Sequence, residues 1–181
     1  MFHVTERLLL RPIWHEDASA IYRGIADETI VRNLARAPWP YSLEDAVSFV
    51  KVRQHPMQPS FAITLAATGE YIGQVGYGPD EDNHLQIGYW VARPHWGRGY
   101  ATEATRAALD IGRMLRLGRI AAAHFIDNPA SGRVLRKAGF TATGEVRPLY
   151  SRARNARYPA ARYAIDLDEV ESSPKAVLQA A

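Results

Sequence analysis

The chain has 181 residues, of which 47% are hydrophobic and 23% are charged, and its formal net charge is +3 at pH 7. This length and composition predict a single globular domain and argue against wholesale disorder. The chain has no cysteine, which excludes disulfide frameworks, thiolate metal sites and cysteine nucleophiles, and we predict no metal site.

The first part of the chain predicts a strand followed by two helices. Residues 7–12 are typical of a strand, and the apolar spacing in residues 18–26 is that of a helix. Two prolines make residues 38–41 irregular. Ser42, followed three residues later by Asp45, predicts a capping box that opens a helix reaching residue 53.

The middle of the chain predicts three antiparallel strands in a meander. These strands are expected at residues 61–67, 71–77 and 85–92, with turns rich in Gly, Asp and Asn between them. A long helix at residues 97–117 and a strand at residues 119–126 follow, so the chain passes from strand to helix to strand.

The last part predicts a short helix and two strands. Asn128 is placed to cap a helix that ends near Ala138 and Gly139. Strands at 140–146 and 162–167 are expected, separated by a basic, flexible segment. We expect one α+β domain over residues 1–167, with a mixed, mostly antiparallel, twisted sheet of about seven strands and about four helices. Residues 168–181 are expected to fray as a C-terminal tail.

The most informative segment joins the third meander strand to the long helix. Gly97 and Gly99 flank Arg98, and the small residue Ala101 follows. Two glycines let the backbone turn tightly and direct successive N–H groups, together with the positive end of a helix dipole, at one anion. The spacing and the absence of a lysine exclude a P-loop, and the position in the chain excludes a dinucleotide fingerprint. For the glycines alone, an ordinary strand-to-helix turn remains the alternative.

Two separated segments together resemble the GNAT acetyltransferases. The family's pyrophosphate motif is Gln or Arg, two residues, Gly, one residue, then Gly or Ala, and it maps onto Trp96, Gly99 and Ala101. Trp96 replaces the usual Gln or Arg, as is common in the ribosomal-protein branch of the family. Residues 127–140 are similar to the family's asparagine helix ending in Lys-x-Gly-Phe. Residues 96–104, with the Thr-Glu-Arg-Leu-x-Leu-Arg pattern at residues 5–11, are most similar to the branch containing ribosomal-protein N-terminal acetyltransferases.

The resemblance implies a GNAT-like sheet and direct transfer of an acetyl group from acetyl-CoA, the cosubstrate, to an amine. The acceptor implied is a protein or peptide N-terminus or a small molecule, and a homodimer is compatible with the family. The residues implied in acetyl-CoA binding are Trp90, Val91, Trp96, Gly97, Arg98, Gly99, Tyr100, Ala101, Thr102, Asn128 and Ser131.

The expected proton-transfer groups differ from the family pattern. Leu135 stands where many members have a tyrosine that protonates the leaving thiolate, and Ser131 is the nearest substitute. Gln86 stands where this branch often has a glutamate, and an amide cannot take a proton. His124 is then the remaining titratable candidate for a base, with a hydrogen-bonded core histidine as the alternative.

The acceptor site is expected to involve Trp39, Tyr41 and the arginine-rich residues 147–162, with loop packing and a solvated charged face as the alternatives. A binding module that keeps acetyl-CoA affinity without catalysis is a second hypothesis. A nucleic-acid binder using the basic segment is a third, which the modest net charge disfavours, so we expect no nucleic-acid partner. No stretch approaches the ~18 apolar residues of a membrane span, and we expect a cytoplasmic protein.

Overall fold

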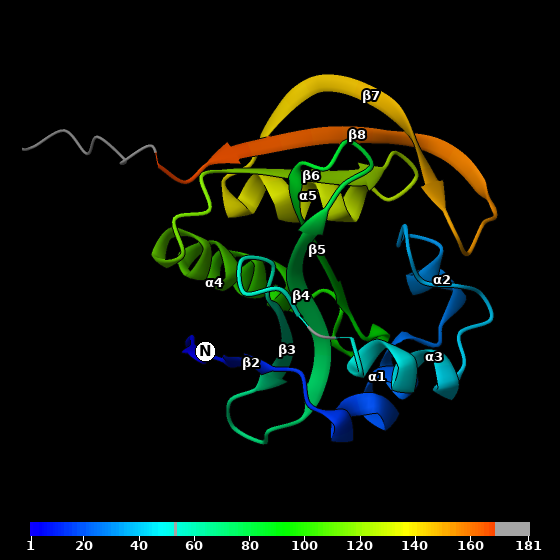
Figure 1. Ribbon diagram of the computed structural model, residues 1–181, viewed down its shortest axis with the longest axis vertical. Coiled ribbons are helices and arrows are strands. Elements are labelled where there is room, and N and C mark those ends of the chain that lie inside the picture. Colours follow the sequence, from blue (N-terminus) through cyan, green and yellow to red (C-terminus); the bar gives the residue numbers. More distant parts are fainter. Residues whose placement is uncertain (53, 169–181) are drawn as a thin grey trace, which may run out of the picture.

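A computed structural model describes residues 1–52 and 54–168. Within these residues one mixed sheet has eight strands in the order β1-β2-β3-β4-β5-β6-β8-β7 (Figure 1). β5 and β6 form its parallel pair, and the other neighbours are antiparallel. The expected α+β class is confirmed, with one strand more than predicted. The strands are β1 (His3–Val4), β2 (Leu8–Pro12), β3 (Ser60–Leu65), β4 (Tyr71–Pro79), β5 (Leu85–Val91), β6 (Arg119–Phe125), β7 (Thr141–Ser151) and β8 (Ala156–Asp166).

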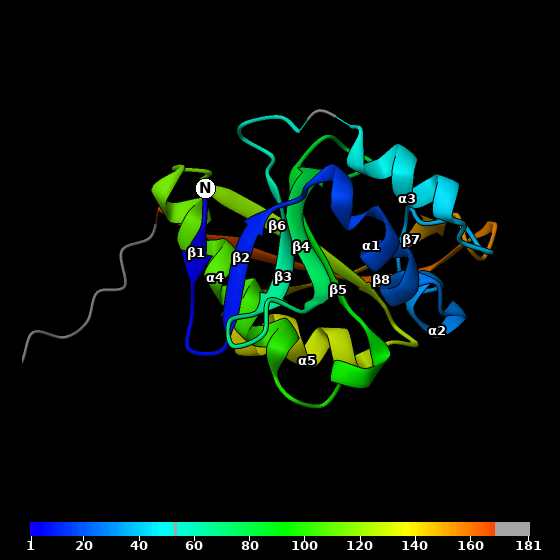
Figure 2. The same ribbon diagram turned by 90° about the horizontal axis from the view of Figure 1, so that it is seen from below.

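Helices cover both faces of the sheet. On one face α4 packs against β2, β4 and β5 and beside α5, and on the other α1 packs against β4, β5 and α3 (Figure 2). Each face therefore has its own hydrophobic core. The helices are α1 (Ala18–Ile25), α2 (Glu28–Val31), α3 (Leu43–Val50), α4 (Tyr100–Met114) and α5 (Pro129–Ala138), with short 3₁₀ helices at His15–Asp17 and Arg93–His95.

The helices begin and end where the sequence predicts a cap. Ser42 Oγ accepts from the N–H of Asp45 (3.1 Å), and Asp45 Oδ2 accepts from the N–H of Ser42 (3.0 Å), which confirms the capping box of α3. Asn128 caps α5 by accepting from the N–H of Ser131, and Gly139 ends that helix with a left-handed φ of 106°. These contacts form between near neighbours in the chain, so the sequence alone could predict them.

The expectation of a flexible segment between the last two strands is wrong. Strands β7 and β8 run on to Ser151 and from Ala156, and they form one long hairpin. Pro148 and Pro159 lie opposite each other in it. Prolines and arginines lower the apparent strand propensity, but β7 is an edge strand and β8 pairs with β6 only as far as Ala160, so neither proline breaks a central ladder.

Two short elements are absent from the sequence-based prediction. These are β1 and α2, and neither is long enough to show a clear apolar period. The helix expected to reach residue 53 ends at Val50, and residue 53 lies outside the described part of the chain. Residues 169–181, almost all of the predicted tail, also lie outside it. No helix in residues 1–52 and 54–168 has both the length and the apolarity of a membrane span.

Candidate functional site

The turn between β5 and α4 has the geometry of an anion cradle. Gly97 and Gly99 adopt positive φ values of 75° and 82°, which favour glycine. Gly99 is the N-cap of α4 and provides no side-chain cap, so the first N–H groups of that helix have no helical carbonyl to bind. These donors and the helix dipole suit a diphosphate, as the sequence predicts.

The turn between β1 and β2 stabilises this anion cradle by contacts with the first turn of α4 and with Arg98. Thr5 Oγ1 and the backbone N–H of Arg7 both donate to Glu103 Oε1 (2.7 and 3.0 Å), in the first turn of α4. The guanidinium of Arg7 binds Glu103 Oε2 (2.6 Å to Nη2), donates to the carbonyl of Arg98 (3.0 Å) and stacks over Tyr100. Burial would raise the pKa of Glu103, but the hydrogen bonds from Thr5 and Arg7 lower it on balance. Two motifs far apart in the sequence thus form one unit.

A cavity of about 580 Å³, here called the cofactor cavity, opens beside the cradle. The structure brings together in its wall all but one of the residues predicted to bind acetyl-CoA, and the exception, Arg98, lies in the exposed turn. Trp96 closes the loop back onto the strand, because its indole Nε1 donates to the carbonyl of Val91 (2.6 Å). A tryptophan at this position of the motif therefore has a structural role. The predicted residues in the wall are Trp90, Val91, Trp96, Gly97, Gly99, Tyr100, Ala101, Thr102, Asn128 and Ser131.

The sheet parts beside this cavity. β5 and β6 are paired in register only at Gln86 and Ala121, and β6 continues along β8 instead. The N–H of Ala92 donates to Ile72 on β4 (2.8 Å). Because backbone groups alternate in direction along a strand, the N–H of Val91 points away from β4, toward the gap. The end of β5 thus presents a backbone donor at the edge of the cofactor cavity.

Tyr89 and Ser131 form a hydroxyl pair across the gap. Tyr89 Oη lies 2.8 Å from Ser131 Oγ and donates to the carbonyl of Ser131 (3.1 Å). Burial raises the pKa of Tyr89 to about 12, although the hydrogen bond with Ser131 lowers it slightly. The phenol therefore keeps its proton at neutral pH. No local sequence pattern marks Tyr89 as a site residue, because its partner Ser131 is 42 positions further along the chain.

A second cavity of about 490 Å³, here called the acceptor cavity, lies on the opposite face of β5. Side chains alternate along a strand, so Gln86 and Trp90 face α1 and α3 while Val91 faces α4. Leu34, Tyr89 and Trp90 belong to the walls of both cavities. The two cavities therefore meet at the gap between β5 and β6.

The chain matches the family described as "Acetyltransferase (GNAT) domain" over residues 7–141. It belongs to the GNAT acetyltransferase family. It is 33% identical over 150 residues to the uncharacterized N-acetyltransferase YoaA of Bacillus subtilis, covering 79% of this chain and 84% of that protein. The predicted enzyme class, an acyltransferase, is confirmed.

Solved structures share this fold. A GNAT acetyltransferase of Bacillus anthracis superposes with a TM-score of 0.80 at 26% identity, covering 93% of this chain and 100% of that one. RimL, a ribosomal L7/L12 alpha-N-protein acetyltransferase solved in complex with coenzyme A, gives a TM-score of 0.77 at 20% identity, over 93% of this chain and 99% of that one. At this identity RimL shows the common fold alone.

Of the remaining predicted site residues of this GNAT chain, Tyr41 lies in a cavity wall, whereas Trp39 and His124 do not. Tyr41 is 9% exposed and lies in the wall of the acceptor cavity, whereas Trp39 is 41% exposed and lies outside that wall. His124 lies beneath α5, where its Nδ1 is 2.8 Å from the carbonyl of Phe125 and its Nε2 is 3.4 Å from Tyr163 Oη. Its imidazole is outside the walls of both cavities.

In the arginine-rich β7–β8 hairpin, Arg154 has a structural role. The side chain of Arg154 is only 7% exposed and binds Asp127 (2.7 Å), the carbonyl of Arg32 (2.6 Å) and the side chain of Asn33 (3.2 Å). Hydrogen bonds from Arg154 lower the pKa of Asp127. This hub fixes the segment after α2 against the N-terminus of α5. Sequence reasoning missed α2 and the segment after it, and with them four wall residues of the cofactor cavity, Thr29, Ile30, Asn33 and Leu34.

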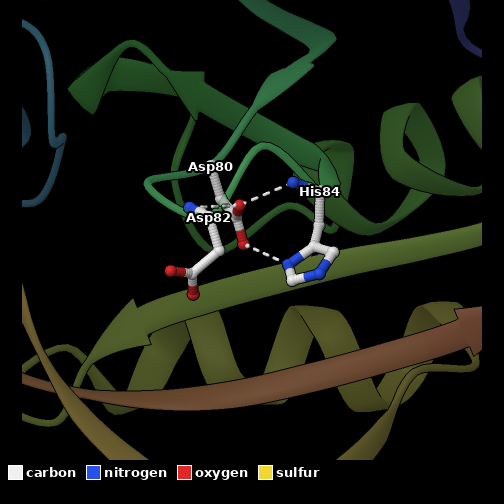
Figure 3. Close-up of side chains that lie close together, drawn as sticks. All are labelled: Asp80, Asp82 and His84. Atoms are coloured by element: carbon white, nitrogen blue, oxygen red, sulfur yellow. Dashed lines mark hydrogen bonds and ion pairs between the residues drawn. The ribbon is translucent and has the colours of Figure 1, made fainter.

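Asp80, Asp82 and His84 cluster in the β4–β5 turn (Figure 3). Asp80 Oδ1 accepts from the backbone N–H groups of Asp82 (2.9 Å) and His84 (2.8 Å), and its Oδ2 lies 3.5 Å from His84 Nδ1. Asp82 also pairs with Arg147 (3.6 Å). The carboxylate of Asp80 is thus used to close the turn, as is typical of an aspartate at this position.

Proposed function

We propose that this chain acetylates a primary amine by direct attack, with acetyl-CoA in the cofactor cavity and the amine in the acceptor cavity. The observation that carries the proposal is the meeting of the two cavities at Leu34, Tyr89 and Trp90, where the sheet parts. An amine from one face and a thioester from the other can reach each other there. Holding two reactants in this way supplies about 7 kcal/mol or more of the barrier reduction.

Acetyl-CoA fits the residues of the cofactor cavity. The uncapped start of α4 and the glycine turn offer main-chain donors to its diphosphate. Arg133 and Lys137 on α5 add positive charge to the same cavity wall. When bound, acetyl-CoA supplies an activated acyl group as a thioester.

We assign polarisation of the acetyl oxygen to the N–H of Val91. This donor points into the gap, and the next peptide unit is held on both sides, by the Trp96 indole at the carbonyl of Val91 and by Ile72 at the N–H of Ala92, which limits movement of Val91 before substrate arrives. One donor of this kind supplies about 3 kcal/mol of transition-state stabilisation. The backbone can therefore polarise the acetyl carbonyl without an acidic side chain.

We assign proton donation to the leaving sulfur to the Tyr89–Ser131 pair. Leu135, where many family members have a tyrosine, is 1% exposed and part of the core. Tyr89 approaches the same region from β5 and binds Ser131 on α5. The amine nitrogen loses one proton to solvent as the C–N bond forms, and the sulfur gains one as the C–S bond breaks.

We do not assign the base to His124, because its imidazole lies between β6 and α5, engaged with Phe125 and Tyr163 and outside the walls of both cavities. Gln86 cannot take a proton, so the acceptor must enter as the neutral amine. This favours activity that rises with pH until the amine is fully deprotonated.

The test is thiol release from acetyl-CoA across a panel of amines and short peptides, run beside calorimetric titration with CoA. Binding with amine-dependent thiol release supports the proposal. Binding without release above the hydrolysis background would instead support a cofactor-binding module, which Leu135 and Gln86 motivate. Absence of binding at millimolar CoA would overturn both.

A further inference from the structure

The wall of the acceptor cavity carries an unequal set of charges. Among the described residues its charged side chains are Arg36, Arg152 and Asp45. Two arginines against one aspartate leave an excess of one positive charge. A polyamine acceptor needs the opposite balance, because each of its ammonium groups has to be matched by an acidic side chain on entering a cavity.

The one carboxylate is already engaged. Asp45 Oδ2 accepts from both the N–H (3.0 Å) and the hydroxyl (2.8 Å) of Ser42 as part of the α3 capping box. Arg36 donates to the carbonyl of Pro79, which fixes its guanidinium at the wall. Arg152 is exposed and, within residues 1–52 and 54–168, forms no ion pair within 4.0 Å. Hydrogen bonds from Ser42, and after them the charge of Arg152, lower the pKa of Asp45, so this carboxylate offsets part of the charge of Arg152. Among the described residues neither Arg36 nor Arg152 forms an ion pair within 4.0 Å, so both guanidinium groups keep N–H donors for a ligand.

The cavity also offers an acceptor for an N–H group. Gln86 Oε1 is buried and, among the described residues, has no hydrogen-bond partner. It lies on the face of β5 that lines the acceptor cavity, on the strand that carries Tyr89 and Trp90. A buried carbonyl oxygen without a partner is costly, and the N–H of an amine would satisfy it. Gln86 can orient a neutral amine toward the gap without taking its proton.

Apolar side chains complete the wall. Ile21 and Ile25 of α1 and Phe49 of α3 line it, and the hydroxyl of Tyr41 has its pKa raised to about 12 by burial, so it too stays neutral. The volume of about 490 Å³ is that of a small-molecule site. The cavity thus combines an amine anchor, an apolar body and a cationic rim.

We propose that the acceptor is a small primary amine that also carries an anionic group, with its nitrogen at Gln86 and its anion between Arg36 and Arg152. This rests on the proposed function and narrows it to one substrate class. A carboxylate and a phosphate share the required chemistry, since arginine binds both through two parallel N–H donors.

The experiment compares amines with and without an anionic group, and kcat/KM for thiol release is expressed per concentration of neutral amine, because the anion also raises the pKa of the amine. Leucine is compared with leucinamide, 6-aminohexanoate with hexylamine, and phosphoethanolamine with ethanolamine. These pairs separate a near carboxylate, a distant carboxylate and a phosphate. We expect the anionic member of at least one pair to be preferred about tenfold or more.

Spermidine and a short acidic peptide complete the panel. Equal or better turnover of spermidine, of the peptide or of every neutral member would overturn the small anionic acceptor while leaving acetyl transfer intact. Thiol release with none of the amines would overturn the proposed function and this inference together.

Substitutions of Arg152 and Arg36 test whether these two residues cause the preference for anionic amines. Arg152→Gln should lower kcat/KM for the preferred anionic amine about tenfold and leave its neutral partner within about twofold, and Arg152→Lys should restore part of the loss. Arg36→Gln should act in the same direction. Arg113→Gln, on the exposed end of α4 beside Asp110, is the matched control. Equal losses for both members of a pair, with unchanged CoA binding, would overturn the assignment.

Discussion

The cofactor cavity and the acceptor cavity are built in different ways. Much of the cofactor cavity's wall comes from two short segments, the glycine turn before α4 and the first turns of α5, and the glycine turn offers main-chain donors; α2, the segment after it and the end of β5 complete the wall. The acceptor cavity is assembled from α1, α3, β3, β4, β5 and two loops. Under the proposed function, binding of acetyl-CoA depends largely on backbone geometry, whereas the choice of acceptor depends on side chains that can change without changing the fold.

The largest effect is expected at the cradle. Gly99→Asp should lower the affinity for CoA about 100-fold, because it places a negative charge beside the diphosphate. Both the aspartate and its asparagine counterpart place a non-glycine residue at a φ of 82°, so the melting temperature should fall by a similar amount in the two variants. Calorimetry and thermal denaturation measure the two effects separately. Gly99→Asn is the uncharged control, and an equal loss in both variants would mean that backbone strain, not charge, causes the effect.

Tyr89→Phe tests the point where the two cavities meet. We expect kcat to fall about 30-fold, as for the loss of one hydrogen bond to a developing charge, with the affinity for CoA within about twofold. Ser131→Ala should act similarly, and the double variant should cost less than the product of the two, because they act as one pair. Steady-state kinetics and CoA titration check this. A matching loss of CoA affinity would show that Tyr89 only packs.

Glu103→Gln tests the contacts of Glu103 with Thr5 and Arg7 next to the anion cradle. It should weaken CoA binding about tenfold and lower the free energy of unfolding by about 1 kcal/mol at neutral pH. The folded-state pKa of Glu103 lies below its ordinary value of 4.5, so the native carboxylate stabilises the fold above that value and loses this contribution as pH falls through the lowered pKa. Denaturant unfolding at several pH values should show wild type and variant converging in acid. A constant difference would contradict the assignment.

The smallest effect is expected at His124. His124→Gln should leave kcat and its pH dependence within about threefold of wild type, because the imidazole contacts Phe125 and Tyr163 rather than either cavity. Gly132→Ala is the contrasting variant, since a Cβ there would lie 2.4 Å from His124 Nε2 and should destabilise the protein. A large loss of kcat in His124→Gln, with the melting temperature unchanged, would support His124 as the general base.

The sequence predicted the local structure around the cofactor cavity better than that around the acceptor cavity. The turn at residues 97–102 and the cap at Asn128 depend on neighbours a few positions away, whereas their role in acetyl-CoA binding was implied by the family resemblance and stays a prediction. Tyr89 could not be identified as a site residue, since its partner Ser131 is 42 positions further along the chain. The outer part of the β7–β8 hairpin was hidden for a similar reason, because residues 147–159 are held by pairing between the two strands, which their own proline- and arginine-rich sequence does not indicate.

By itself, the sequence determined the order of most strands and helices, the caps of α3 and α5, and the glycine turn that opens α4. These features arise from short-range hydrogen bonds and steric limits that a few consecutive residues impose. Only the tertiary structure decided where the sheet parts, that Tyr89 meets Ser131 across the gap, and that Arg36 and Arg152 share a wall with Gln86. Cavities are enclosed by residues from distant segments, so their shape and charge depend on packing that no local pattern encodes.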